Sequence, residues 1–260
     1  MTVMTGYIYN AEGIRVSKGT ITAWSCDPTI NGFQTQHDSI LGPGPGNEQM
    51  TEVVANAGTM AWEHTNVWAA GKLIATYDTS GTSTDGSFTN VGLHFYLNDP
   101  LGTRRAQTDY AGVLEQVCQE LPFGDGLACS GTASDPTAHH FTSKQRDSET
   151  GNDYFDARFY ASMMGRFMIP DWSSKPLPVP YVDLTNPQSL NLYLYALNNP
   201  LNRYDADGHD WRHLVQKAKQ WVNSHPRTVA AAKAVGAATA TTFAMVTLLG
   251  RIDIYTLQPG

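Results

Sequence analysis

The sequence predicts a mainly β protein, and three observations support this fold class. Short segments rich in β-branched and aromatic residues recur along the first half of the chain. The 260 residues include 23 Gly and 14 Pro, and many of these turn-forming residues lie between those segments. From Gly6 to about Leu127, no apolar pattern keeps the 3.6-residue period of an amphipathic helix. We therefore expect a turn-rich β-sheet over this part of the chain.

Nine segments have the composition and alternation of strands. In chain order they are Tyr7–Tyr9, Ile14–Val16, Thr20–Trp24, Gln49–Val54, Trp62–Val67, Lys72–Tyr77, Leu93–Leu97, Arg104–Thr108 and Val113–Glu120. Two stretches between them are expected to be loops. One is Leu41–Asn47, which alternates Gly and Pro, and the other is Thr79–Ser87, which consists of small polar residues.

One turn pattern recurs, in which Asp or Asn is followed three positions later by Gly. It occurs at Asn10–Gly13, Asp78–Gly81, Asp99–Gly102, Asp109–Gly112 and Asp205–Gly208. The side-chain oxygen of the first residue can accept hydrogen bonds from backbone N–H groups within the turn, and Gly allows a positive φ. We therefore expect hairpin turns at these places, with positive φ at Gly13, Gly102, Gly112 and Gly208.

Several segments, in chain order, match the motifs of one protein family. Tyr7–Val16 resembles the tyrosine–aspartate (YD) repeat of Rhs proteins. The later segments are similar to successive motifs of the Rhs repeat-associated core, and they are Phe95–Arg105, Leu121–Asp125, Tyr154–Tyr160 with Met164–Asp171, and Asn191–Asn202. The resemblance covers roughly residues 1–209.

This resemblance implies a β-sheet that forms part of a hollow shell, followed by a core domain that plugs one end. It divides the chain into a YD-repeat-type region at 1–130, an Rhs repeat-associated core at 131–209 and a variable C-terminal tail at 210–260. It also implies a secreted or cell-surface protein of the polymorphic-toxin type, although residues 1–7 do not have the pattern of a signal peptide. Its expected partners are the remainder of an Rhs shell or a C-terminal toxin cargo.

In several Rhs proteins the variable segment is released by self-cleavage just after the core, with acidic residues activating the attack. In that family the core ends in the motif Asp-Pro-x-Gly-Leu. Here Asp205 and Gly208 match this motif, whereas Ala206 and His209 stand in place of its Pro and Leu. The resemblance makes Asp205, Asp171 and Asp207 the candidate catalytic residues, with cleavage near Gly208 or His209. The alternative is that Asp205 and Asp207 only shape the last turn.

Other residues have side chains suited to binding. His139-His140 and the pair His209 and His213 could be metal ligands, but neither has a third ligand at a fixed offset, so we predict no metal and no cofactor. Cys118 and Cys129 could form a disulfide in an exported protein or remain reduced. Several aromatic residues could line a carbohydrate groove, as in an adhesin, or could pack as cross-strand pairs. They are Trp62, Trp68, Trp172, Tyr193 and Tyr195.

The C-terminal tail differs in charge and composition from the rest of the chain. Residues 1–208 contain 11 Lys or Arg and 22 Asp or Glu, whereas residues 209–260 contain 6 and 2. An apolar stripe at helical spacing runs from Trp211 to Val222, and it predicts an amphipathic helix that ends before Pro226. Val229–Leu249 is long enough to span a bilayer, but Lys233 and the many Ala residues favour a buried or partner-seeking helix.

The overall formal charge of −7 argues against a nucleic-acid partner. The sequence therefore predicts a mainly β Rhs core fragment with a short α-helical C-terminal extension. Its predicted role is structural, capping a β-shell ahead of a variable segment. Two alternatives stay open, namely an aspartyl self-cleaving core and an adhesin or sugar-binding module, and an enzymatic role would be at most single-turnover.

Overall fold

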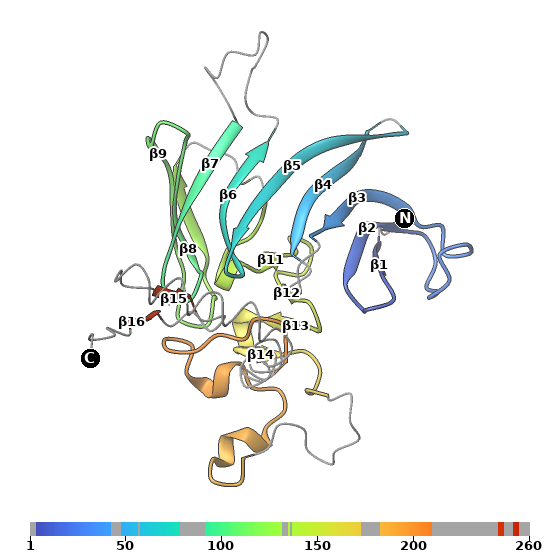
Figure 1. Cartoon of the computed structure of the whole chain (residues 1–260). Helices are drawn as coiled ribbons and strands as arrows, with labels where there is room; N and C mark the ends of the chain where they lie inside the picture. Colours follow the sequence, from blue (N-terminus) through green and yellow to red (C-terminus); the bar gives the residue numbers. More distant parts are fainter. Residues whose placement is uncertain are drawn as a thin grey trace, which may run out of the picture.

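A computed structural model describes residues 4–42, 48–56, 58–78, 92–131, 135, 137–172, 183–209, 244–246 and 252–254. Its main feature is a ten-stranded antiparallel sheet in which each strand pairs with the next one in the chain (Figure 1). The strands are β1 Met4–Tyr9, β2 Arg15–Ile21, β3 Gln34–Leu41, β4 Gln49–Asn56, β5 Thr59–Ala69, β6 Lys72–Asp78, β7 Gly92–Asn98, β8 Arg104–Thr108, β9 Leu114–Gln119 and β10 Ala128–Gly131.

The predicted hairpin turns at Asn10, Asp99 and Asp109 are confirmed, since each joins two paired strands, whereas the turn at Asp205–Gly208 forms but joins no strands in the described residues. In the turns that begin at Asn10, Asp99 and Asp109, one side-chain oxygen of that residue accepts two backbone N–H groups at 2.8–3.0 Å. The glycine at the fourth position has positive φ in all four cases predicted, at Gly13, Gly102, Gly112 and Gly208. The hydrogen bonds of these turns join residues that are close in sequence, so the local pattern suffices to predict them. Residues 79–81 of the turn predicted at Asp78–Gly81 lie outside the described residues.

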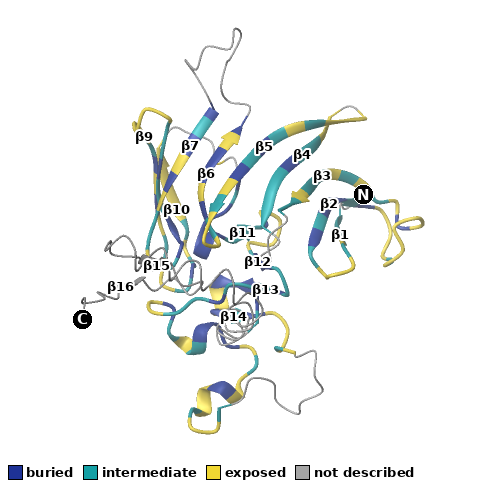
Figure 2. Ribbon diagram, in the orientation of Figure 1, coloured by how far each residue is buried: buried dark blue, intermediate teal, exposed yellow. Residues whose placement is uncertain are grey.

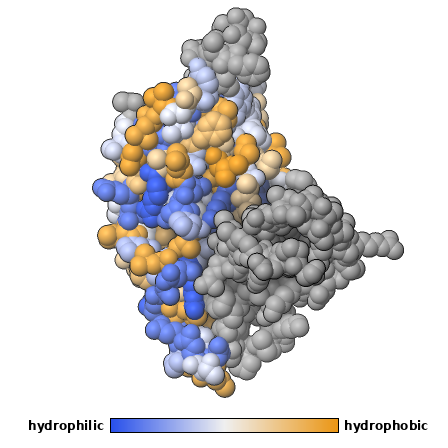
Figure 3. All heavy atoms as spheres, turned by 60° about the vertical axis from the view of Figure 1, so that its left-hand side comes forward, coloured by the Kyte–Doolittle hydropathy of each residue, from blue (hydrophilic) through white to orange (hydrophobic). Residues whose placement is uncertain are grey.

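The two faces of the large sheet have the reverse of the usual polarity. Buried polar side chains occupy the inner face, which is directed toward the remainder of the chain, and they include Ser17, Glu52, His64, Asn66, Thr76, His94 and Gln107. The outer face exposes apolar side chains, including Trp62, Val67, Tyr77, Phe95, Leu97 and Val117. Buried and exposed positions alternate along β5, β6 and β7 (Figure 2). Apolar residues accordingly gather on the upper surface over the side where β7, β8 and β9 lie (Figure 3).

A smaller four-stranded sheet lies below the large one (Figure 1). Its strands are β11 Gln145–Arg146, β12 Asp153–Phe155, β13 Arg158–Ala161 and β14 Arg166–Phe167. Short 3₁₀ turns accompany it, namely η1 Phe141–Ser143, η2 Ser162–Met164, η3 Pro187–Leu190 and η4 Ala196–Asn198. The start of η3 is capped, since the Asn186 side chain accepts the N–H of Gln188 at 3.2 Å and Pro187 lies in the first turn.

The hydrophobic core lies in this second part of the chain and is mostly aromatic. It consists of Phe141, Phe155, Tyr160, Phe167, Tyr195 and Ala196, with Phe123 packed against it. The rings of Tyr160 and Tyr195 lie 4.8 Å apart, and those of Phe155 and Phe167 meet edge to face at 5.6 Å. Residues from three of the motifs that resemble the Rhs core therefore build one packed cluster.

Several strand predictions were wrong in detail. Ile14–Val16 and the start of Thr20–Trp24 belong to one strand, β2, which ends at Ile21 and leaves Trp24 largely exposed. The strands β3 and β10 were missed. In β3 the inner-facing residues include His37 and Ser39, so burial follows no hydrophobic alternation that a pattern search could detect. The loop predicted at Thr79–Ser87 lies outside the described residues.

The predicted helical tail is contradicted where the structure describes it. Within Val229–Leu249 only Ala244–Val246 is described, and it forms a strand, β15, paired with β16 Ile252–Ile254. The stripe from Trp211 to Val222 and the rest of 210–260 lie outside the described residues. Among the residues that are described, no helix has the length and apolar character needed to cross a membrane.

Candidate functional site

Two of the three predicted acidic residues, Asp171 and Asp205, contact one buried cation, Arg158. Arg158 begins β13, directly after the tight turn that joins β12 to β13. Its Nη2 lies 3.1 Å from Asp171 Oδ2 and 3.4 Å from Asp205 Oδ2. The side chains of Arg158, Asp171 and Asp205 are buried. The Arg158 guanidinium also lies over the ring of Phe167, at 3.6 Å from its centroid. Residues far apart in sequence therefore form one charged cluster.

Arg158 also binds the last turn of the core through backbone atoms. Its Nε donates to the carbonyl oxygen of Gly208, and its Nη1 donates to the carbonyl oxygen of Leu192 at 3.0 Å. The backbone N–H of Ala157 donates to the Asp207 carbonyl at 3.2 Å. The guanidinium thus fixes the carbonyl of the Gly208–His209 peptide bond, which is one of the two predicted cleavage positions.

Asp205 shapes that turn and is itself buried, with 2% of its surface exposed. Its Oδ1 accepts the N–H groups of Asp207 and Gly208 at 3.2 and 2.9 Å. Burial, with the nearby Asp207 carboxylate, raises the pKa of Asp205 well above its usual value, although Arg158 acts in the opposite direction. The protonated form of Asp205 is thereby more favoured than that of an exposed aspartate.

Gly208 is placed where no side chain fits. It has a φ of +76°, and a Cβ atom there would lie 2.1 Å from the carbonyl oxygen of Phe155. The following residue, His209, donates its N–H to Asp207 Oδ1 at 3.2 Å, and its Nδ1 lies 2.9 Å from Asp171 Oδ1. Both ends of the Gly208–His209 peptide group therefore contact ionisable side chains.

This arrangement has the parts that peptide-bond hydrolysis needs. A cation polarises the Gly208 carbonyl, as a preorganised donor does when negative charge develops on that oxygen. A buried carboxyl with a raised pKa and two further carboxyls lie around the same bond. The same contacts would equally hold the turn closed without any reaction.

Two of the acids that the sequence analysis selected, Asp171 and Asp205, lie together in the structure, but that analysis missed Arg158, the residue that joins them. A signal was present, because Arg158 lies inside the segment Tyr154–Tyr160 that resembles the Rhs core signature. Buried carboxylates need a cationic partner, and the signature that contains Asp171 offers two Arg residues for that role, Arg158 and Arg166.

A second polar network joins the core segment to the inner face of the large sheet. Arg15 on β2 donates through Nη1 to both carboxylate oxygens of Asp147, at 3.0 and 2.8 Å, and its N–H donates to the Tyr154 hydroxyl at 2.9 Å. Further along the sheet, Ser143 Oγ accepts the N–H of Leu73 at 3.2 Å and donates to the Gly102 carbonyl at 2.9 Å. The core segment is therefore attached across several strands.

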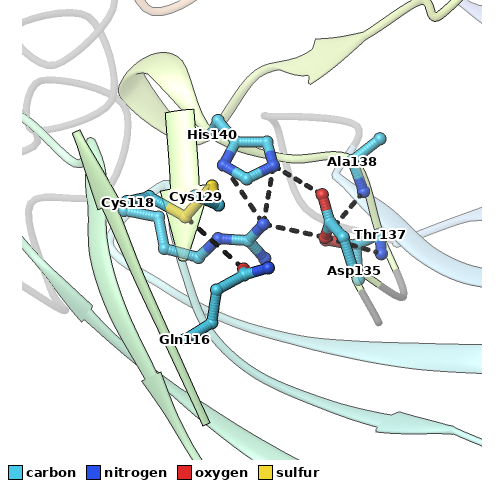
Figure 4. Close-up of a disulfide and its surroundings, with 8 residues drawn as sticks. Gln116, Cys118, Cys129, Asp135, Thr137, Ala138 and His140 are labelled. Atoms are coloured by element: carbon cyan, nitrogen blue, oxygen red, sulfur yellow. Dashed lines mark hydrogen bonds and ion pairs between the residues drawn. A yellow bond between two sulfur atoms is a disulfide. The ribbon is translucent and has the colours of Figure 1, made fainter. Parts of the chain in front are cut away.

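The cysteines and histidines that the sequence analysis considered for binding contact other residues of the protein. Cys118 and Cys129 form a disulfide between β9 and β10, and Cys26 is free and exposed. Near the disulfide, His140 and Asp135 contact each other (Figure 4), and Arg104 lies 2.8 Å from Asp135. His139 Nδ1 lies 2.7 Å from the Thr137 carbonyl oxygen.

The aromatic residues considered for sugar binding lie in different environments. Trp62 packs on Tyr77 on the outer face of the sheet, and Trp68 packs on His139. Trp172 contacts His209 edge to face, Tyr193 is exposed and Tyr195 is fully buried in the aromatic core. The adhesin alternative therefore gains no support from their arrangement.

Comparisons with known proteins identify the fold. No protein-family model and no curated protein matches the sequence. Among solved structures, the chain is similar to the crystal structure of TcdB2-TccC3-TEV, with 21% identity over 78% of this chain and a TM-score of 0.53. A crystal structure of TcdB2-TccC3 without its hypervariable C-terminal region is similar at 22% identity over 78% and a TM-score of 0.52.

The Tc holotoxin pore of Photorhabdus luminescens, with a mutation in TccC3, is similar at 21% identity over 78% and a TM-score of 0.53. The match spans only 9% of each of these chains. The class that the fold defines is therefore a mainly β, open antiparallel sheet of the kind found in Rhs-type β-shell proteins. Solved structures that share this fold include those of TcdB2-TccC3 and of the Tc holotoxin pore.

Proposed function

We propose that this chain is a capping segment of a secreted, toxin-associated β-shell, in which residues 131–209 close the shell ahead of a variable segment at 210–260. The observation that carries the proposal is the attachment of the core segment to the polar inner face of an open sheet. Arg15–Asp147 and Ser143–Leu73 are the clearest of these contacts. A shell needs such an inner face to hold its plug in place.

The edges of the sheet support an incomplete shell. In the described residues, β1 and β10 are edge strands, each paired on one side only. Exposed edges present unpaired N–H and C=O groups, which further strands can continue. The remainder of a shell is therefore the partner that this sheet fits.

The end of the core fits a boundary with a variable region. Arg158 and Asp205 close the turn at Gly208, in the last segment that resembles the Rhs core. One of the similar solved proteins, TcdB2-TccC3, has a hypervariable C-terminal region. The Cys118–Cys129 disulfide is in keeping with a protein that leaves the reducing cytoplasm.

A chimera tests the capping role. Residues 1–209 would replace the matching segment of a TcdB2-TccC3 chain, and protease access to the hypervariable C-terminal region would be followed by mass spectrometry. We expect the region to stay protected in the chimera and to become accessible when Asp147→Asn weakens the Arg15 contact. Glu12→Gln, at an exposed turn, is the control and should keep protection. A folded chimera that leaves the region fully accessible would contradict the capping role.

A second candidate function is single-turnover self-cleavage, and the polarised Gly208 carbonyl is the observation that favours it. Water would attack this carbonyl carbon, the C–N bond to His209 would break, and the leaving nitrogen would take up a proton. Asp205 is the first candidate for the acid or base, Asp171 the second, and Asp207 contacts the leaving N–H. Arg158 would stabilise the oxyanion.

Intact-mass measurement tests this candidate. The purified chain would be kept for a day at pH values from 4 to 8 and then weighed. Self-cleavage predicts a new basic fragment that begins at His209 or Asp210 and does not form in Asp205→Asn. Asp109→Asn changes the same kind of turn at an exposed place and is the matched control. A chain that stays intact at every pH contradicts cleavage and leaves the capping role unaffected.

A further inference from the structure

A second cluster of ionisable residues lies far from the Arg158 site, on the inner face of the large sheet. It consists of His37 on β3, Glu52 on β4 and Glu63 on β5. His37 Nδ1 lies 2.9 Å from Glu52 Oε1 and 3.2 Å from Glu63 Oε2. One ligand atom from each residue lies within 4.8 Å of the other two. One imidazole and two carboxylates thus converge on a single point.

A β-bulge accounts for the convergence. The β4–β5 register pairs Glu52 with His64 and Val53 with Trp62, so Glu63 is the extra residue on β5. A bulge of this kind changes the direction of a side chain that regular alternation would send to the opposite face. Glu63 therefore joins His37, Glu52 and His64 on the inner side, where all four line one cavity of about 210 Å³.

His64 provides an independent observation. It is 1% exposed, it lines the same cavity, and neither of its ring nitrogens has a hydrogen-bond partner among the described residues. A buried imidazole without a partner loses the hydrogen bonds that it would make in water. A bound ion with its own water molecule in the cavity would supply the missing partner.

We propose that His37, Glu52 and Glu63 form a binding site for a divalent transition-metal ion of the Zn²⁺ type, with an open position that faces His64. Imidazole and carboxylate are ligands that Zn²⁺ accepts, and three protein ligands with one water is an established arrangement for this ion. Bonds of 2.0–2.1 Å place neighbouring ligand atoms of a tetrahedral ion about 3.3 Å apart. The two measured separations, 2.9 and 3.2 Å, are close to that spacing.

The surroundings orient the proposed ligands. Gln49 Nε2 donates to Glu52 Oε2 at 2.9 Å, which leaves Oε1 directed at His37. Hydrogen bonds of this type hold metal-binding carboxylates in position. The cations nearest to the cavity are committed elsewhere, since Arg15 pairs with Asp147 and Lys18 with Glu149. A divalent ion would displace the proton that His37 shares with the two carboxylates, and Glu52 and Glu63 would then balance the charge of the ion.

The chain offers a matched control in another histidine with two carboxylates. His94 lies 2.6 Å from Glu115 through Nδ1 and 3.4 Å from Asp78 through Nε2. Because the two carboxylates contact opposite nitrogens of the ring, they cannot join His94 on one ion. Glu115→Gln therefore removes the same chemical group as Glu63→Gln without touching the proposed site.

Zn²⁺ titration of the untagged, chelator-treated 260-residue chain tests the proposal. Isothermal calorimetry should give one saturable site, Zn²⁺ should raise the melting temperature, and Glu63→Gln should weaken the affinity at least tenfold. Glu115→Gln should bind as the unchanged chain does. Co²⁺ in place of Zn²⁺ should give a visible absorption band that is lost in Glu63→Gln. Absence of saturable binding, or equal binding by both variants, would overturn the proposal.

Discussion

Replacing Gly208 by Ala separates the two reasons why glycine is needed at the last turn of the core. One is the positive φ of +76°, which an L-residue adopts at a cost of about 1–2 kcal/mol. The other is space, because an added Cβ would lie 2.1 Å from the Phe155 carbonyl oxygen and 3.0 Å from the backbone nitrogen of Arg158. Forcing these backbone atoms apart adds about 1–3 kcal/mol.

Gly112 provides the comparison. Its φ of +81° is nearly the same, but a Cβ there would meet no heavy atom within 4 Å. Gly112→Ala should therefore lower the free energy of unfolding by about 1–2 kcal/mol, and Gly208→Ala by about 2–5 kcal/mol. The two losses in free energy of unfolding therefore differ by about 1–3 kcal/mol, which corresponds to a difference of about 2–12 °C in melting temperature for a chain of this size.

Urea denaturation of both variants, followed by tryptophan fluorescence, would measure the difference. Intact mass should be checked in parallel, because cleavage after Gly208 would change the species being unfolded. Equal losses in the two variants would refute the close approach of Gly208 to β12 and β13, and with it the seating of the last turn against Arg158.

Two further predictions follow from buried groups. Burial raises the pKa of Glu120 to about 7, and neither carboxylate oxygen has a hydrogen-bond partner among the described residues. Because the folded-state pKa is higher than the unfolded one, stability is retained below about pH 4.5 and falls as the pH rises toward 7. Glu120→Gln should therefore raise the free energy of unfolding at pH 8 by about 1–3 kcal/mol and change it little at pH 4.5. A similar gain at both pH values in urea melts would contradict this burial. The Cys118–Cys129 disulfide closes a loop with a sequence separation of 11, so the double Ser variant should lose about 3 kcal/mol. A melting curve that dithiothreitol leaves unchanged would show that the bond does not form.

Much of the fold follows from local sequence. The Asp- or Asn-x-x-Gly turns were predicted correctly because their hydrogen bonds join atoms within five residues, as at Asp109 and Val113. Strands rich in β-branched and aromatic residues, such as Lys72–Tyr77 in β6, were found because that composition is also a local signal. The acidic residues Asp171, Asp205 and Asp207 were identified through the motifs that contain them.

Only the tertiary structure decided which of these residues meet. The polar inner face hides strands such as β3 from a search for hydrophobic alternation, since its buried positions are occupied by groups that pair across the sheet. Arg158 becomes the centre of the acidic cluster because β13 and the last turn, about 47 residues later in the chain, pack together. His37, Glu52 and Glu63 converge because strand register and one bulge place three distant side chains on one face. Local sequence determines turns, whereas pairing between distant segments determines sites.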